Sequence, residues 1–302
     1  MLRARITKQR GVALIQVLLI SALVMMLALQ ISFDTKSQLK LATGYTHKVN
    51  AEAQIYSAKS ELLYTLITQN HSKQINDDGL VGKWNFYNAP FFIDQVEVRM
   101  QDAAGLHSII ASPSSRLAQQ LVYLGMPEST AERFSATFLN WQAPVSDWQF
   151  GGVTEQELND LGISPRHGPM QFSSEFEQII KALLAADNID ESDLISRIKC
   201  CFSMYSAGDL NLLTAPEAIW GALVGPDYVE RLSAEREMGS LDRASFIGIT
   251  GWQSQESVGF LSSSTVLIEF KATSGDISQR LKLDVTLQPE SSNIPFLIRK
   301  RS

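Results

Sequence analysis

The residue types that most often carry chemistry are sparse in this chain. Its histidines lie far from one another and form no HxxxH-type spacing: His47, His71, His107 and His167. The sequence contains no GxSxG motif, no phosphate-binding loop and no CxxC pair, the patterns that indicate hydrolytic, nucleotide or redox sites. We therefore expect no enzyme and no catalytic residues, and we expect the histidines to be surface or capping residues.

The two cysteines, Cys200 and Cys201, are adjacent. They could form a redox or metal site, or they could be two small apolar residues at a helix end or a strand start. We favour the second interpretation, because a metal site needs more ligands than this pair supplies. A disulfide between neighbours also departs from the usual Cα separation.

A short acidic segment is a first candidate for a cation site. Its carboxylates are Asp187, Asp190, Glu191 and Asp193. A calcium loop of the EF-hand type needs oxygen ligands at alternating positions, a central glycine and a terminal glutamate. The spacing here does not supply them, so we expect a solvated helix start.

The N-terminus carries a pattern that indicates proteolytic processing. Four basic residues precede a glycine: Arg3, Arg5, Lys8 and Arg10. Directly after Gly11 comes an uncharged run from Val12 to Phe33. A prepilin peptidase would cut between Gly11 and Val12 and leave the hydrophobic segment on the mature protein. An ordinary signal peptide has a shorter apolar region and a small-x-small cleavage site after it, and no clean site of that type follows here.

The apolar run is long enough to cross a membrane. At about 1.5 Å per residue, Val12 to Ile31 would span roughly 30 Å, the thickness of a bilayer core. We predict a leader at 1–11 and a transmembrane segment at 12–33. Because the flanking basic residues lie only on the N-terminal side, the N-terminus should be cytoplasmic and the bulk of the chain periplasmic. The expected location is the inner membrane, with a single pass.

The helix should continue beyond the membrane. Between Asp34 and Gln69 there is no proline and a single glycine. Apolar residues recur with helical spacing at Ile55, Ala58, Leu62 and Leu66, and a neighbouring stripe carries Tyr45, Val49 and Tyr56. This spacing predicts a helix with one buried face. A lipid-bound helix that continues into an amphipathic half is the shape of a pilin.

The body of the chain reads as strands at both ends and helices between. Alternating apolar residues predict strands within 92–100, 265–272 and 279–287, with a turn at 273–276. Helices are expected at 115–124, from a cap at Ser129 or Thr130 to Trp141, at 173–186, and from Pro216 to Leu223. The predicted class is α+β: a long N-terminal helix on an antiparallel sheet. The pilin-like domain would be split between 34–107 and 261–302 by a helical insertion at 108–260.

The net charge argues against nucleic acid as a partner. The chain has 32 acidic and 26 basic residues and a charge of −6, which becomes −10 without the four basic residues of the leader. The stretch 115–141 invites a helix-hairpin-helix interpretation, and such units often hold DNA. We favour a module of the same topology that packs against protein, because phosphate binding needs a basic face.

Three segments resemble the GspK family, the large minor pseudopilin of type II secretion. They are the leader Gln9-Arg10-Gly11-Val12-Ala13-Leu14-Ile15, the segment Leu139-Asn140-Trp141, and Gly208-Asp209-Leu210-Asn211-Leu212-Leu213-Thr214-Ala215-Pro216. The last is similar to the family stretch G-x-[IVL]-N-[IVL]-N-T-A-P, with Leu213 where the family commonly has asparagine. The resemblance covers nearly the whole chain and is most specific at the N-terminus and at 208–216.

The resemblance implies a place at the tip of a short periplasmic pseudopilus. There the chain would join other minor pseudopilins and prime assembly of the major pseudopilin filament, after prepilin peptidase has cut and N-methylated it. The fifth mature residue supports the tip. Major pilins usually have glutamate there, which neutralises a neighbour's N-terminal amine, whereas this chain has Gln16. A neutral amide suits a subunit with no amine above it, because an unpaired carboxylate in hydrocarbon is costly. Alternatively, Gln16 is a tolerated polar residue.

One departure from the family concerns calcium. Many members have an acidic motif of the type D-W-x-D-x-D followed by G-x-E-D, which looks suited to this ion. Most of those carboxylates are missing here, and the remaining candidates are Asp147, Glu155 and Glu157. They form a weak set for a cation that prefers six to eight oxygen ligands, so we predict that calcium binding is weak or absent.

Two other functions stay open on the sequence. The chain could be a single-pass, membrane-anchored periplasmic binding module that keeps its leader. It could also be a minor pilin of a type IV pilus.

Overall fold

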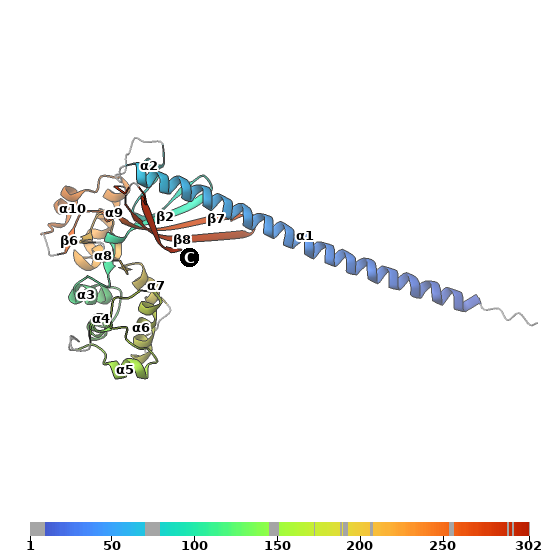
Figure 1. The fold of residues 1–302 in the computed structure, drawn as a ribbon, viewed down its shortest axis with the longest axis horizontal. Coiled ribbons are helices and arrows are strands. Elements are labelled where there is room, and N and C mark those ends of the chain that lie inside the picture. Colours follow the sequence, from blue (N-terminus) through green and yellow to red (C-terminus); the bar gives the residue numbers. More distant parts are fainter. Residues whose placement is uncertain are drawn as a thin grey trace, which may run out of the picture. The chain divides into compact units, whose positions relative to one another are not determined.

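The computed structural model describes residues 10–69, 79–144, 151–171, 173–187, 189, 193–205, 208–253, 257–288, 290–291 and 293–301. The chain forms two compact units. The first contains Met1–Gln54 and Ala272–Gln279, and the second contains Ile55–Lys271 and Arg280–Ser302. The long helix α1 (Arg10–Thr68) begins in the first unit and ends in the second (Figure 1).

The first unit contains the apolar half of α1. This helix is long and apolar enough to cross a membrane: an 18-residue stretch of it has a mean hydropathy of 2.5, with none of that stretch buried. Hydroxyl groups within the helix bond to its own backbone, as when Ser21 donates to the carbonyl of Leu18 and Thr35 to that of Ile31. Each such bond satisfies its hydroxyl donor within the helix itself.

The first unit also contains the end of a hairpin, where β7 (Thr265–Ser274) turns into β8 (Ile277–Leu287). This turn lies against α1: Nδ1 of His47 is 3.0 Å from the Ser274 hydroxyl. A Cβ at Gly275 would lie 2.8 Å from the His47 ring, and Gly275 has a φ of +54°. Glycine at this position therefore allows both the turn and its close approach to the helix.

The second unit is built around a five-stranded sheet of order β1-β2-β7-β8-β9. Its other strands are β1 (Tyr87–Ile93), β2 (Val96–Asp102) and β9 (Phe296–Arg301). The pairs β1/β2, β2/β7 and β8/β9 are antiparallel. In Figure 1 the green β2 and the red β7, which are far apart in the sequence, lie side by side.

The core of this sheet follows the alternation that the sequence predicts. Val96, Val98 and Met100 are buried on β2, as are the alternate residues of β7 from Val266 to Ala272. On α1 the predicted face of Ile55, Ala58, Leu62 and Leu66 is buried. Leu63 is buried as well. The long helix packed on an antiparallel sheet confirms the α+β, pilin-like class. The neighbouring stripe is different, because Tyr45, Val49 and Tyr56 are exposed.

The structure corrects several element bounds. The segment from 92 to 100 is two strands, because Asp94, with a φ of +51°, turns the chain between them. The β7–β8 turn is shorter than predicted and leaves Thr273 and Ser274 in β7. Ser129 and Thr130 do not cap a helix: α4 (Glu128–Gln142) begins earlier, with Pro127 at its N-cap.

Helices occupy the chain between β2 and β7. They are α3 (Ser114–Tyr123), α4, α5 (Glu155–Asp160), α6 (Ser173–Ala186), α7 (Leu194–Lys199), α8 (Glu217–Leu223), α9 (Val229–Glu237) and α10 (Arg243–Thr250). α2 (Leu80–Lys83) precedes β1. Two short parallel pairs link these segments: β3 (His107–Ser108) with β4 (Phe202–Ser203), and β5 (Leu210–Asn211) with β6 (Val258–Gly259). Aromatic side chains, among them Phe134, Phe138 and Trp220, fill the core between them.

Candidate functional site

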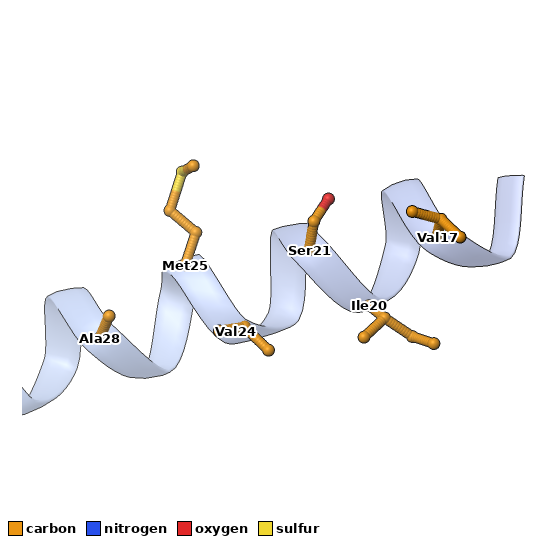
Figure 2. Close-up of a pocket in the computed structure, with 6 residues that line it drawn as sticks. All are labelled: Val17, Ile20, Ser21, Val24, Met25 and Ala28. Atoms are coloured by element: carbon orange, nitrogen blue, oxygen red, sulfur yellow. The ribbon is translucent and has the colours of Figure 1, made fainter. Parts of the chain in front are cut away.

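Within the N-terminal half of α1, residues 13–33 present an apolar surface in which the polar side chains are Gln16, Ser21, Gln30 and Ser32. Helix α1 begins at Arg10, so the predicted cleavage junction Gly11–Val12 lies at its first turn. Beyond it the apolar side chains are exposed, as at Leu14, which is 65% exposed. Figure 2 shows six side chains of this half, and the only polar atom among them is the Ser21 hydroxyl oxygen. An exposed apolar surface of this extent marks contact with lipid or with other proteins.

Gln16 lies in this surface and is itself exposed. Its neighbours Ile15 and Val17 are 60% and 62% exposed. Whatever covers this helix therefore surrounds Gln16 as well, and a charged group at position 16 would be more costly there than the neutral amide.

The calcium candidates that the structure describes have other partners. The Glu157 carboxylate accepts hydrogen bonds from the backbone and hydroxyl of Thr154, at 2.8 and 2.7 Å. These bonds lower the pKa of Glu157 and close a capping box at the start of α5. Oε1 of Glu155 lies 3.4 Å from Nε2 of His167. Asp147 lies outside the described residues.

Within the described part of the chain, no group of three or more His, Cys, Asp or Glu residues could hold a metal ion. In the acidic segment, Asp187 pairs with Arg133 at 2.9 Å, and Asp193 pairs with Arg197 at 3.2 Å. Asp193 is the N-cap residue of α7, which agrees with a helix start there. Asp190 and Glu191 lie outside the described residues.

The family-like segment 208–216 is held by a buried carboxylate that the sequence analysis did not single out. Asp102, at the end of β2, is 1% exposed. Its Oδ2 accepts hydrogen bonds from the Asn211 amide at 3.1 Å and the Thr214 hydroxyl at 3.0 Å. Its Oδ1 accepts from the Ser263 hydroxyl at 2.7 Å, and from the backbone N–H groups of Ser263 and Ala104. We call Asp102, Asn211, Thr214 and Ser263 the Asp102 cluster.

The Asp102 cluster joins three segments that are far apart in the sequence. These are the end of β2, the segment 208–216 and the approach to β7. Gln101 adds a hydrogen bond from its side chain to the Thr214 carbonyl, at 2.9 Å. A Cβ at Gly105 would lie 2.5 Å from the same carbonyl oxygen, so the close approach requires glycine. The arrangement holds segments together and presents no reactive group to solvent.

An arginine fixes the end of the same segment. Nη1 of Arg236 donates to the Ala215 carbonyl at 2.8 Å, and its guanidinium lies over the Trp220 ring at 4.2 Å from the centroid. The same guanidinium also lies 4.4 Å from the Tyr87 ring centroid. The Trp220 indole donates to the Leu212 carbonyl at 2.7 Å. Backbone carbonyls along 212–215 are thus paired with side chains, which explains a distinctive sequence in a segment with little regular structure.

A signal in the sequence could have identified Asp102. Val96, Val98, Met100 and Asp102 share one parity along the strand, so the carboxylate falls in the buried phase of the alternation. A charged residue in a buried phase requires several donors around it. Arg236 carries no comparable signal, since its contacts come from segments that only the fold brings together.

The histidines do not converge on one site. His107 is buried, contrary to the expectation of a surface position, with Nε2 3.3 Å from the Gln120 side-chain oxygen. Burial lowers the pKa of His107 to about 4. His47 contacts the hairpin turn, His167 faces Glu155, and His71 lies outside the described residues.

The cysteines lie where the sequence predicts them, between a helix end and a strand start. Cys200 follows α7 and Cys201 precedes β4. Cys201 is fully buried, as expected of an apolar residue, but Cys200 is exposed.

Comparison with known proteins gives a match among solved structures. No family model and no curated protein sequence matches the chain. Among solved structures, the chain is similar to one in the GspK-GspI-GspJ complex of the type 2 secretion system from enterotoxigenic Escherichia coli. The TM-score is 0.52 at 15% identity, over 89% of this chain and 98% of that chain. The likeness establishes a pseudopilin-like fold.

Proposed function

We propose that the protein is a minor pseudopilin of a type II secretion system, a structural subunit with no catalytic role. The observation that carries the proposal is the helix α1, which exposes an apolar surface over its N-terminal half and buries one face against a sheet over its C-terminal half. The fold likeness to a chain of a type 2 secretion complex supports it.

The exposed half of α1 suits two successive environments. Before assembly, residues 12–33 would cross the inner membrane once, with the N-terminus cytoplasmic and the remainder periplasmic. After cleavage at Gly11–Val12 and methylation of Val12, the same apolar surface would pack among other pilin helices. Both surroundings are apolar, so the helix surface would pass from lipid to filament without being exposed to water in between.

We place the subunit at the pseudopilus tip. The structure in the match is a complex of GspK with GspI and GspJ, and we propose two further minor pseudopilins as the partners of this chain. Gln16 supports the tip position, because it is a neutral group where a subunit of the filament body would need a carboxylate. In that position the complex would prime assembly of the major pseudopilin. A binding module and a type IV pilus minor pilin remain the competing hypotheses.

We also propose the division that the sequence predicts, with a pilin-like domain at 34–107 and 261–302 and a helical insertion at 108–260. Calcium would bind weakly or not at all near Glu155 and Glu157, because Thr154 already donates to Oε2 of Glu157 and His167 already contacts Oε1 of Glu155. Isothermal titration of the purified protein with calcium chloride should give no heat of micromolar binding. A micromolar site that is lost on Glu155→Gln would contradict this.

Processing provides the decisive test. N-terminal sequencing and mass analysis of the membrane-extracted protein should find methylated Val12 as the first residue. Gly11→Leu should retain the leader, and Gly44→Ala, a glycine change farther along the same helix, should be cut normally. An intact Met1 on the unmodified chain would refute the pseudopilin and favour a membrane-anchored binding module. Cross-linking to minor pseudopilins of the secretion system, or to those of a pilus, would then separate the two filament systems.

A further inference from the structure

The adjacent cysteines form an asymmetric pair at the surface of the second unit. Their Sγ atoms lie 3.4 Å apart. Cys200 is exposed at the end of α7, whereas Cys201 is fully buried. A reagent in solution can therefore reach only Cys200, and any sulfur chemistry at Cys201 must pass through its neighbour.

The buried member is held firmly in place. The backbone N–H of Cys201 donates to the Ile198 carbonyl at 3.0 Å, and its carbonyl accepts from the His107 N–H at 2.8 Å. The Gln120 side-chain N–H group lies 3.7 Å from its sulfur. The Cys200 thiol donates to the Arg197 carbonyl at 2.9 Å, and its sulfur otherwise contacts the Cys201 sulfur. The exposed sulfur is thus free to react, beside a second sulfur that is fixed within reach.

We propose that Cys200 and Cys201 are a thiol–disulfide exchange site, which closes to a reversible vicinal disulfide on meeting a disulfide oxidant. Cys200 loses its proton to water and attacks one sulfur of the oxidant, whose S–S bond breaks to release one thiolate. Cys201 then loses its proton and attacks the Cys200 sulfur, which breaks the mixed disulfide and releases the second thiolate. The pair gives up two electrons and two protons, and the oxidant is reduced to two thiols.

The acid–base properties of the pair agree with these roles. The hydrogen bond from Cys201 lowers the pKa of Cys200 to about 7. That bond and burial together raise the pKa of Cys201. An exposed thiol of low pKa beside a resolving cysteine is the arrangement that favours oxidation. Cys200 is therefore the attacking group, and Cys201 reacts only after the mixed disulfide has formed.

The adjacency of the cysteines makes the oxidised state reversible. Neighbouring Cα atoms are about 3.8 Å apart across a trans peptide, which is shorter than the roughly 4.4–6.8 Å that disulfides prefer. The closed ring is strained and therefore easily reduced. Closure must also twist the Cys200–Cys201 peptide, whose N–H is bonded to the Ile198 carbonyl. Oxidation should consequently loosen the end of α7.

The test uses the full-length protein in detergent, equilibrated with mixtures of glutathione and glutathione disulfide. After an acid quench and alkylation, the unmodified chain should lose two hydrogens in intact mass and stay monomeric on a non-reducing gel. Dithiothreitol should restore both thiols. Cys201→Ser should accumulate a glutathione adduct on Cys200, because the resolving sulfur is gone. Cys200→Ser should form no adduct, because Cys201 is out of reach.

Three results would overturn the proposal: both thiols free across the whole range, a stable glutathione adduct on the unmodified chain, or a disulfide-linked dimer. Both variants are close in size to the original side chain, and circular dichroism checks that each is folded. Hydrogen exchange at the Cys201 amide, which is bonded to the Ile198 carbonyl, should rise on oxidation only in the chain with both cysteines. A chain that keeps its leader can still pass this test, so its outcome is independent of the proposed secretion role.

Discussion

Asp102 shows how a single buried carboxylate can determine the path of three segments. Both of its oxygens accept hydrogen bonds, and the donors include two backbone N–H groups and three side chains. In Asp102→Asn, one oxygen becomes an NH₂ group that faces donors instead of accepting from them. Leaving such groups unsatisfied costs about 1–3 kcal/mol for each.

We expect Asp102→Asn to lower the free energy of unfolding by about 2–4 kcal/mol. Urea denaturation followed by tryptophan fluorescence measures this, because Trp84 and Trp220 are fully buried. Asp209→Asn is the matched control: it lies in the same family-like segment, but its side chain is exposed, and it should change stability by less than about 0.5 kcal/mol. Equal losses in the two variants would contradict the role given to Asp102.

His107 makes stability depend on pH in a defined direction. Its pKa in the folded protein is about 4, below the value of about 6.5 for an unfolded chain. Between these values the unfolded state binds a proton that the folded state excludes. Stability should therefore fall by up to about 1.4 kcal/mol per pH unit as the pH drops from 6.5 towards 4.

In His107→Gln this part of the pH dependence should disappear, whatever the variant costs at neutral pH. His167→Gln, which removes a more exposed histidine, should keep it. Urea midpoints at pH 7.5 and pH 5 for the three chains give the comparison. An unchanged difference between the two midpoints in His107→Gln would refute the assignment.

At the scale of elements, the β7–β8 hairpin shows a backbone requirement that combines with a tertiary contact. Gly275→Ala places a new methyl group against the His47 ring, and the alanine must also adopt a positive φ. Gly162→Ala also occupies a positive φ, of +77°, but meets nothing within 4 Å. The difference between the two variants therefore isolates the contact, since the backbone cost of about 1–2 kcal/mol is common to both.

We expect Gly275→Ala to increase hydrogen exchange at 272–279 and around His47, while Gly162→Ala changes exchange only near its own site. Mass spectrometry of peptides after timed labelling resolves the two regions. If the variants behave alike at the hairpin, the His47 contact has no energetic role. Combining His47→Ala with Gly275→Ala removes the ring that the new methyl group meets. If this contact causes the loss of protection, the double variant should recover part of it.

The elements that the sequence predicts best are those with a strong apolar period. The buried face of α1 and the alternation of β2, β7 and β8 depend on local patterns that burial then enforces. Strand β9 was missed, because Phe296–Arg301 ends in basic residues and has no clear alternation. It becomes a strand by pairing with β8. The Asp102 cluster was missed for a related reason: its members come from segments that meet only in the folded chain.

At the scale of the whole molecule, the proposed function depends on what surrounds position 16. In a filament body, a carboxylate there would pair with a neighbour's N-terminal amine. At the tip no amine lies above it, and a charged side chain in apolar surroundings costs about 2.5–3.5 kcal/mol. The sign of the effect of Gln16→Glu therefore reports the position of the subunit.

If the chain sits at the tip, Gln16→Glu should reduce assembly, and with it secretion, by more than about tenfold, since each 1.4 kcal/mol is a factor of ten. Gln16→Leu should be tolerated, because it stays neutral. Gln30→Glu places the same charge at the far end of the apolar run, where snorkelling to the interface lowers the cost, and should have a smaller effect. Secretion assays and cross-linking to the other minor pseudopilins measure all three variants. Unchanged or improved assembly of Gln16→Glu would move the subunit from the tip into the filament body, because only there does a partner amine exist.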